Sequence, residues 1–268
     1  MDSAPTAYLD RPGGRIAYDL SGAGPLIIAA PGMGDLRAVY RFMIPALVEA
    51  GYRVAAMDLR GHGDSDATFP SYDDAAAGSD MIALATRLGP PAVLIGNSMA
   101  GGAAVWAAAE TPDLVAGLVL IDPFVRNTDI GFWKMLAFRA GLLRPWGPAV
   151  WSAYYAGSYP GRPPADLAGH RARIREGLRR PGHWRAFVAT THTSHLPAEA
   201  RLGQVHARTL VVMGNKDHDF ADPEAEARLV AGRLNGRTVI VPGAGHYPQA
   251  EYPEVVNPAV VEFLGRTA

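Results

Sequence analysis

The sequence contains no cysteine, and this absence excludes disulfide bonds, thiolate metal ligands and a cysteine nucleophile together. An excess of charge is missing as well, because 25 Lys and Arg residues stand against 26 Asp and Glu residues, giving a formal net charge of −1. Domains that bind nucleic acids usually carry a basic surplus. The composition therefore predicts no nucleic acid partner and favours a small-molecule substrate.

Long apolar runs are also missing. No run approaches the roughly 18 residues of a membrane span, and the first residues, MDSAPTAYLDRPGGR, lack the basic start and apolar stretch of a signal peptide. We therefore expect a cytoplasmic protein without a membrane segment. Of the 268 residues, 49% are apolar and 19% are charged, which suits one large α/β domain or a core domain with an insertion.

Short apolar runs rich in Val, Ile and Leu are present instead, each about as long as a strand. They occupy residues 25–30, 53–59, 92–96, 117–122, 209–214 and 238–243. Runs that are apolar throughout are typical of strands covered on both faces. The start of the chain favours an antiparallel hairpin that turns at Pro12, Gly13 and Gly14.

Helical patterns separate these apolar runs. They cover residues 38–50, 74–88, 99–110, 222–234 and 256–265. The fourth pattern has Asp222 as a candidate N-cap and Pro223 in the first helical position. Strands that alternate with helices predict an α/β fold with a mostly parallel sheet and helices on both faces.

Residues 124–200 interrupt this alternation. They contain no Val- and Ile-rich run of strand length, but they gather aromatic residues and a series of arginines. The arginines are Arg171, Arg173, Arg175, Arg179, Arg180 and Arg185. We expect a helical cap (124–200) inserted between the two parts of the core, 1–123 and 201–268. Most of these arginines are expected on solvated helix faces, and a substrate carboxylate is the alternative partner for them.

Ser98 stands at the junction of an apolar run and an alanine-rich helical pattern, in GNSMAGG (96–102). A strand that turns sharply into a helix brings its backbone close to itself, so Gly96 and Ala100 must be small. The residue at the tip of such a turn is strained and presents its side chain above the sheet edge, as a nucleophile requires. An ordinary serine N-cap after a strand is the alternative without a catalytic role.

A serine nucleophile needs a base, and the base needs a carboxylate to orient it. Among eight histidines, His246 follows the last predicted strand through a glycine-rich turn. It is therefore expected on the same sheet edge as Ser98, where open α/β sheets build their sites. Asp217, directly after the strand 209–214, is the first candidate for the carboxylate. Asp219 and Asp122 remain alternatives.

These segments together resemble the α/β-hydrolase fold superfamily over nearly the whole chain. Besides GNSMAGG, the similar segments are PGMGDL (31–36), MDLRGHGDSD (57–66), GNKD (214–217) and GAGH (243–246). The resemblance implies an eight-stranded, mostly parallel sheet with a helical cap and a Ser98–Asp217–His246 triad. It further implies that the backbone N–H groups of Met33 and Met99 bind an oxyanion. We expect no metal ion and no organic cofactor.

Three functions fit these residues. The first is a serine hydrolase that cleaves a small ester, thioester or lactone through an acyl-enzyme on Ser98, with Gly32, Asn97 and Tyr247 among the substrate-binding residues. The second is a carbon–carbon bond hydrolase of the type that splits meta-cleavage products of aromatic rings. Asn97 before the serine favours it, whereas Tyr247, where such enzymes commonly have tryptophan, counts against it. The third is a receptor that keeps the fold and only traps a ligand.

Overall fold

The computed structural model describes residues 5–127 and 132–265, except for the side chains of 132–135. Its strands are β1 (Ala7–Arg11), β2 (Gly14–Ser21), β3 (Leu26–Ala30), β4 (Arg53–Met57), β5 (Ala92–Asn97), β6 (Val115–Ile121), β7 (Arg208–Gly214) and β8 (Arg237–Val241). They form one eight-stranded sheet in the order β1-β2-β4-β3-β5-β6-β7-β8. Strand β2 pairs antiparallel with both β1 and β4, and all other pairs are parallel. The predicted hairpin and the mostly parallel sheet are both confirmed.

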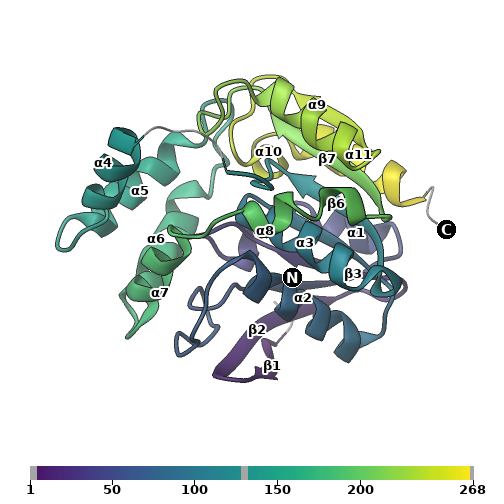
Figure 1. The fold of residues 1–268 in the computed structure, drawn as a ribbon, viewed down its shortest axis with the longest axis horizontal. Helices are drawn as coiled ribbons and strands as arrows, with labels where there is room; N and C mark the ends of the chain where they lie inside the picture. The colour runs from purple at the N-terminus through teal and green to yellow at the C-terminus, as the bar shows by residue number, and fades with distance from the viewer. Residues whose placement is uncertain (1–4, 128–131, 266–268) are drawn as a thin grey trace.

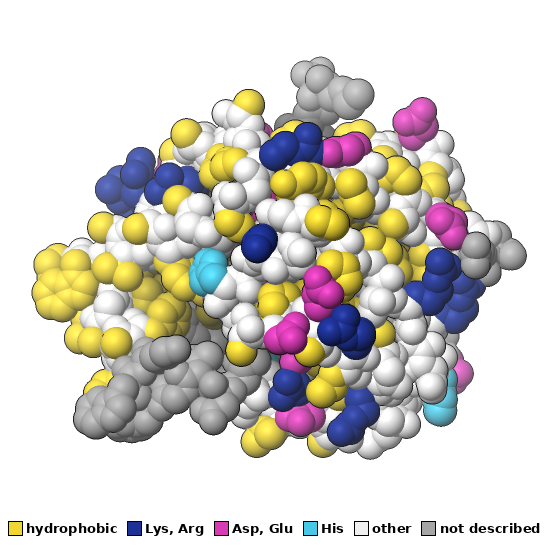
Figure 2. All heavy atoms as spheres, turned by 90° about the horizontal axis from the view of Figure 1, so that it is seen from above, with side chains coloured by type: hydrophobic (Ala, Val, Ile, Leu, Met, Phe, Trp, Pro, Cys, Tyr) yellow, Lys and Arg dark blue, Asp and Glu magenta, His cyan; other side chains and the backbone are white. Residues whose placement is uncertain are grey.

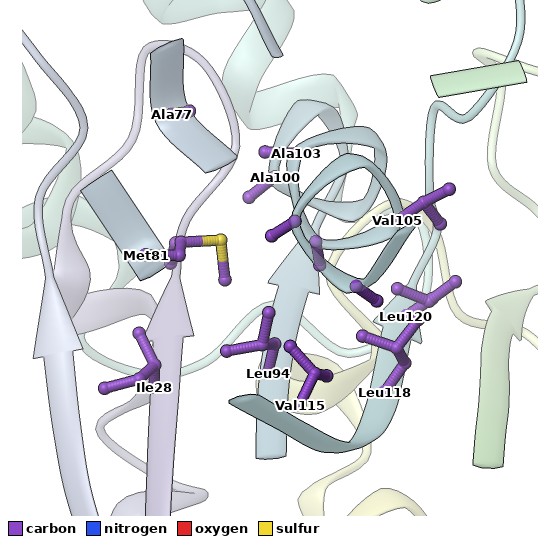
Figure 3. Close-up of a cluster of buried hydrophobic side chains, with 14 of the residues drawn as sticks. Ile28, Ala77, Met81, Leu94, Ala100, Ala103, Val105, Val115, Leu118 and Leu120 are labelled. Atoms are coloured by element: carbon purple, nitrogen blue, oxygen red, sulfur yellow. The ribbon is translucent and has the colours of Figure 1, made fainter. Parts of the chain in front are cut away.

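The strands bury side chains on both faces of the sheet, as continuous apolar runs predict. In β3, Ile28 belongs to one core cluster and Ile27 to the other. The same alternation holds in β5, where Leu94 and Ile95 point to opposite faces. Figure 3 shows the first of these cores, where strand side chains meet residues of two helices, among them Met81. The sheet is therefore a buried layer between helices.

The helices outside residues 124–200 cover the two faces of the sheet. They are α1 (Ile44–Glu49), α2 (Asp74–Leu88), α3 (Met99–Glu110), α9 (Pro223–Arg233), α10 (Pro248–Glu251) and α11 (Pro253–Gly265). Residues of α2, α3 and α9 join the core on one face, and residues of α1 and α11 join the core on the other. Figure 1 shows the resulting three layers.

Two helix predictions differ from the structure near prolines. The predicted helix 38–50 is divided into a 3₁₀ helix, Arg37–Tyr40, and α1. Pro45 has no N–H for an α-helical bond to the preceding turn, and proline is tolerated only in the first turn of a helix. Helix α11 begins at Pro253, earlier than the predicted start at 256, and it contains Pro258. The predicted N-cap is confirmed, because the Asp222 side chain accepts the N–H of Ala225 at 2.9 Å.

Further helices lie between β6 and β7. They are α4 (Phe132–Gly141), α5 (Gly147–Gly157), α6 (Leu167–Arg179), α7 (His183–Thr190) and α8 (Leu196–Glu199). Helices α4 to α7 stand to one side of the sheet in Figure 1, whereas α8 contacts α2 and α3. Figure 2 shows apolar side chains gathered at the end formed by α4 and α5, where Leu143 and Trp146 are more than half exposed. No helix in the described part of the chain is long and apolar enough to cross a membrane.

Candidate active site

Ser98 lies at the tip of the turn between β5 and α3. Its backbone has φ 56° and ψ −126°, a conformation that residues with a side chain rarely adopt. Three hydrogen bonds hold it there. The Ser98 N–H donates to the carbonyl of Ile121 at 2.9 Å, and its own carbonyl accepts the N–H groups of Gly101 and Phe124 at 2.9 and 3.0 Å. The chain thus fixes a strained serine at the carboxyl end of a central strand.

Small residues around Ser98 allow the turn, because neighbouring segments of the chain approach it closely. A Cβ atom on Gly96 would lie 2.2 Å from the carbonyl oxygen of Ala100. One on Gly101 would lie 2.5 Å from Cβ of Pro123, and one on Gly102 would lie 2.6 Å from the carbonyl oxygen of Phe124. All these distances are far below a van der Waals contact, so larger residues would force the turn open.

His246 and Asp217 are in direct contact beyond the neighbouring strands. The Nδ1 atom of His246 lies 2.6 Å from Oδ2 of Asp217, and the two side chains are 5% and 0% exposed. The Asn97 side chain donates to the carbonyl of His246 at 3.2 Å, which ties this loop to the residue before Ser98. Among the described residues, Ser98 and His246 share no hydrogen bond. The structure therefore joins His246 to Asp217 directly and to the serine turn through Asn97.

The two partners change each other's proton affinity. Burial lowers the pKa of His246, but the neighbouring Asp217 carboxylate outweighs burial and raises that pKa from 6.5 to about 9. Burial raises the pKa of Asp217, but the His246 charge and the hydrogen bond between them bring that pKa below its ordinary value. Each group therefore stabilises the charged form of the other.

This coupling predicts a pH dependence of stability. Because folding raises the pKa of His246, its contribution is complete below pH 6.5 and is lost as the pH rises through about 9. The contribution of Asp217, whose pKa is lowered, is instead lost in acid. Between pH 6.5 and 9.5, the free energy of unfolding should fall by about 3 kcal/mol more in the wild type than in His246→Gln. Urea unfolding at several pH values measures this difference.

The control for that experiment is His206→Gln, which changes an exposed histidine. This variant should keep the alkaline loss of stability seen in the wild type. Equal pH slopes in His246→Gln and the wild type would contradict the coupling of His246 with Asp217.

The two alternative carboxylates have different surroundings. Asp122 directly follows β6, is fully buried, and accepts the N–H of Gly214 at 3.0 Å. Burial first, and then the charge of Asp217, raise the pKa of Asp122 well above its usual value. Asp219 contacts the Tyr154 hydroxyl and lies 3.5 Å from Nδ1 of His246. Asp217 thus makes the shortest carboxylate contact with His246.

Among the described residues, one group has donor atoms close enough to hold a metal ion. It consists of Asp122, Asp217 and His246. Their donor atoms lie within 4.8 Å of one another, and all three residues are buried. The same closeness is accounted for by hydrogen bonding, because Nδ1 of His246 already bonds to Asp217 and Oδ1 of Asp122 already bonds to Gly214. We therefore interpret the group as a hydrogen-bonded acid–base cluster.

Met33 and Met99 line the same cavity as Ser98. Helix α3 begins at Met99, so the Met99 N–H is one of the four that a helix leaves without an internal partner. Met33 lies in the loop after β3, and its neighbour Gly32 touches the serine. A Cβ atom on Gly32 would lie 2.7 Å from Cβ of Ser98 and 3.2 Å from its Oγ. The two loops that present these N–H groups therefore meet at the serine.

The close approach at Gly32 predicts the effect of a small substitution. In Gly32→Ala the new methyl group must displace Ser98 or the loop, because its Cβ would lie 2.7 Å from Cβ of Ser98. We expect kcat/KM for p-nitrophenyl butyrate to fall by about 10²- to 10³-fold, as when an oxyanion donor is lost. Gly203→Ala is the matched control, since a Cβ atom on Gly203 would meet nothing within 4 Å. Unchanged activity in Gly32→Ala would show that this contact does not position the serine.

Two histidines outside the candidate triad hold the loop that contains Met33. Nε2 of His62 accepts the N–H of Gly34 at 2.8 Å, and its Nδ1 lies 2.9 Å from the Arg60 carbonyl. Burial lowers the pKa of His62 to about 4, which fits a neutral ring. From the other side, Nε2 of His170 in α6 lies 2.7 Å from Oδ1 of Asp35. No sequence motif indicated this second contact.

The cavity above Ser98 has a volume of about 450 Å³, which suits a small organic molecule. Its lining residues are Met33, Ser98, Met99, Phe124, Asn127, Phe138, Arg139, Tyr154, Thr190, Thr191, His192, Thr193, Ser194, His195 and Asp219. Sequence reasoning missed most of them, because they come from separate segments that share no motif. The wall combines apolar and aromatic surface with a few polar groups, as ligand sites commonly do.

Asn97 and Tyr247 lie behind the cavity wall. Asn97 is fully buried, and its side chain donates to the carbonyls of Ile121 and His246 at 3.0 and 3.2 Å. Tyr247 is 3% exposed and stacks on Tyr159 with ring centroids 4.8 Å apart. In this structure both residues support the loop of His246, and their role in substrate binding stays a prediction.

Comparison with known proteins identifies the family. A model of the alpha/beta hydrolase family matches residues 27–259. The chain belongs to this family. Its match runs from β3 into α11 and includes every segment that forms the candidate site. This member of the alpha/beta hydrolase family is therefore a hydrolase, and the family suggests a small-molecule substrate.

Individual relatives agree with this assignment. The 2-(acetamidomethylene)succinate hydrolase of Mesorhizobium japonicum is 29% identical over 261 residues, which cover 94% of this chain and 92% of that protein. The 2-hydroxy-6-oxononadienedioate/2-hydroxy-6-oxononatrienedioate hydrolase of Klebsiella pneumoniae is 32% identical over 234 residues, covering 83% of this chain and 80% of that protein. The structure of a hydrolase from Pseudomonas aeruginosa has a TM-score of 0.79 at 27% identity, covering 97% and 98% of the two chains. Each is similar to this alpha/beta hydrolase over most of its length.

Proposed function

We propose that this hydrolase cleaves a small carboxylic ester, thioester or lactone through an acyl-enzyme on Ser98. The observation that carries the proposal is the buried contact between His246 and Asp217, 2.6 Å long, at the sheet edge where the strained Ser98 lines a cavity. A buried carboxylate on Nδ1 orients the imidazole and leaves Nε2 free to act as a base. In the proposed mechanism the Ser98 hydroxyl donates to Nε2 in the complex with substrate, since catalytic hydrogen bonds are often long before substrate binds.

In the proposed reaction, Oγ of Ser98 attacks the carbonyl carbon while its proton moves to Nε2 of His246. The carbonyl oxygen becomes an oxyanion, which the N–H groups of Met33 and Met99 stabilise. The intermediate then expels the alcohol or thiol, which takes the proton from His246, and the acyl group stays on Ser98. Water attacks this ester, gives a proton to His246, and the carboxylic acid leaves as Ser98 recovers its proton.

We infer that helices α4 to α7 act as a cap over this site. Thr190 of α7, Tyr154 of α5 and Phe138 of α4 contribute to the cavity wall opposite the serine turn. Such a wall excludes water from the reacting carbonyl and selects the acyl and leaving groups by size. The substrate preference of this hydrolase is therefore expected to depend on residues of these helices.

A fluorophosphonate probe tests the proposal before any natural substrate is known. The probe should add one phosphonyl group to the peptide that contains Ser98, located by peptide mass, and should abolish hydrolysis of p-nitrophenyl butyrate in proportion to labelling. Ester hydrolysis that persists after complete labelling of Ser98 would exclude Ser98 as the nucleophile. A protein that is neither labelled nor active against a broad ester panel would fit the ligand receptor instead.

Carbon–carbon bond hydrolysis is the second candidate. Asn97 directly before Ser98 favours it, as does similarity to the Klebsiella pneumoniae hydrolase, whose name denotes a 2-hydroxy-6-oxo dienedioate substrate. The same Ser98 and His246 would then act on a vinylogous diketone acid. Spectrophotometric decay of such a compound, faster than ester hydrolysis under the same conditions, would favour this reaction over the first.

A further inference from the structure

A second histidine–aspartate pair borders the cavity. Nδ1 of His195 lies 2.8 Å from Oδ2 of Asp74, the first residue of α2. The Asp74 side chain is fully buried, whereas His195 keeps 15% of its side chain exposed and lines the cavity. Helices α2, α3 and α8 lie side by side around this pair (Figure 1). The arrangement repeats one feature of the contact between His246 and Asp217, namely a buried carboxylate on Nδ1 of the ring.

Contacts of both its ring and its backbone fix the position of His195. Its backbone N–H donates to the Asn127 side chain at 2.8 Å, and its face stacks on Phe124 with centroids 5.7 Å apart. Gly102 makes room for the carboxylate, because a Cβ atom there would lie 2.7 Å from Oδ2 of Asp74. Glycine inside a helix costs about 1 kcal/mol relative to alanine. This glycine therefore leaves room both for the buried carboxylate and for the carbonyl oxygen of Phe124, which would lie 2.6 Å from a Cβ atom there.

The hydrogen bond with Asp74 fixes what His195 can offer to a ligand. Nδ1 faces the carboxylate, so Nε2 is the ring nitrogen left for the cavity. A ring that carries both protons donates Nδ1–H to Asp74 and presents Nε2–H to an anion in the cavity. Arg139 and His192 line the same cavity, which adds further positive charge or donors on this wall. Among the described residues of the lining, Asp219 carries the carboxylate, and it lies 3.5 Å from Nδ1 of His246.

We propose that His195, oriented by Asp74, binds a carboxylate group of the substrate at a point remote from the scissile bond. The substrate class is then a half-ester, thioester or keto acid with a second, free carboxylate. This inference rests on the proposed function, which places the reacting carbonyl group at Ser98. Phe124 contacts the rings of both His195 and His246, at 5.7 and 5.9 Å between centroids, so one small molecule can span the distance between them.

Two esters with the same number of acyl carbons test the proposal. Mono-p-nitrophenyl succinate carries a terminal carboxylate where p-nitrophenyl butyrate carries a methyl group. Binding is measured by calorimetry in Ser98→Ala protein, so that no turnover is needed. The succinate ester should bind more tightly than the butyrate ester. His195→Gln, which keeps a donor for Asp74, should weaken binding of the succinate ester by about tenfold or more and leave the butyrate ester unchanged.

Control variants make each outcome decisive. His206→Gln alters an exposed histidine that does not line the cavity and should leave the preference for succinate intact. Asp74→Asn serves if His195→Gln does not fold, and it should also reduce the preference. Equal weakening of both esters by His195→Gln, or no preference for succinate in the parent, would overturn the assignment. If the succinate ester still binds more tightly than the butyrate ester but the wild type hydrolyses neither, only the proposed function is rejected.

Discussion

Ser98→Ala is expected to lower kcat for p-nitrophenyl butyrate by about 10⁶-fold, because nucleophile and base act as one unit and the loss of either removes the whole covalent route. The backbone of the turn should survive, since its hydrogen bonds to Ile121, Gly101 and Phe124 involve main-chain atoms of Ser98 only. The variant should therefore fold, bind the ester with a KM or Kd close to that of the wild type, and fail to turn it over.

The matched control is Ser194→Ala, which removes another hydroxyl group from the wall of the same cavity. Its kcat for the neutral ester should stay close to the wild-type value. Stopped-flow release of p-nitrophenol should show a burst in the wild type if the acyl-enzyme accumulates, and none in Ser98→Ala. Comparable turnover by Ser98→Ala and the wild type would remove the acyl-enzyme from the mechanism and leave ester cleavage to a different group.

The sheet and the serine turn could be predicted because local rules decide them. Residues 92–96 form an apolar run that is buried in the structure, as in a central strand, and Gly96, Gly101 and Gly102 stand where any side chain would strike neighbouring atoms. The position of His246 follows from topology, since parallel strands end at one edge of the sheet. The apolar runs and the glycine spacing carry these predictions of the fold, whereas the catalytic roles of Ser98 and His246 stay predictions.

The contacts that shape the cavity could not be predicted in the same way. His195 and Asp74 are 121 residues apart, and His170 and Asp35 are 135 apart. Neither pair belongs to a motif, because each forms only when helices between β6 and β7 pack onto the core. The start of α11 was missed for a different reason: the helix begins at Pro253, before the predicted start at 256, and proline is favoured in the first position of a helix.

The second large effect on kcat is expected when Asp217, rather than Asp122 or Asp219, is replaced by asparagine. Asp217→Asn should lower kcat by about 10⁴-fold, because an amide on Nδ1 of His246 favours the wrong tautomer and cannot stabilise the imidazolium. Asp122→Asn should leave kcat close to the wild-type value. The raised pKa of Asp122 favours a neutral group at that position, and the Asn side-chain oxygen can still accept the N–H of Gly214. Asp219→Asn should have only a small effect, since Asp219 lies 3.5 Å from Nδ1.

Rates of the three variants on p-nitrophenyl butyrate, compared with their melting temperatures, separate catalytic from structural effects. Asp217→Asn should lose activity while it stays folded. Asp122→Asn should melt no lower than the wild type, because the raised pKa of Asp122 favours a neutral carboxyl group, which an amide replaces without a change of charge. If Asp122→Asn lost activity while Asp217→Asn stayed active, Asp122, at the end of β6, would be the carboxylate that orients His246. His246 would then have to turn its Nδ1 from Asp217 toward Asp122, whose donor atom lies within 4.8 Å of the other two.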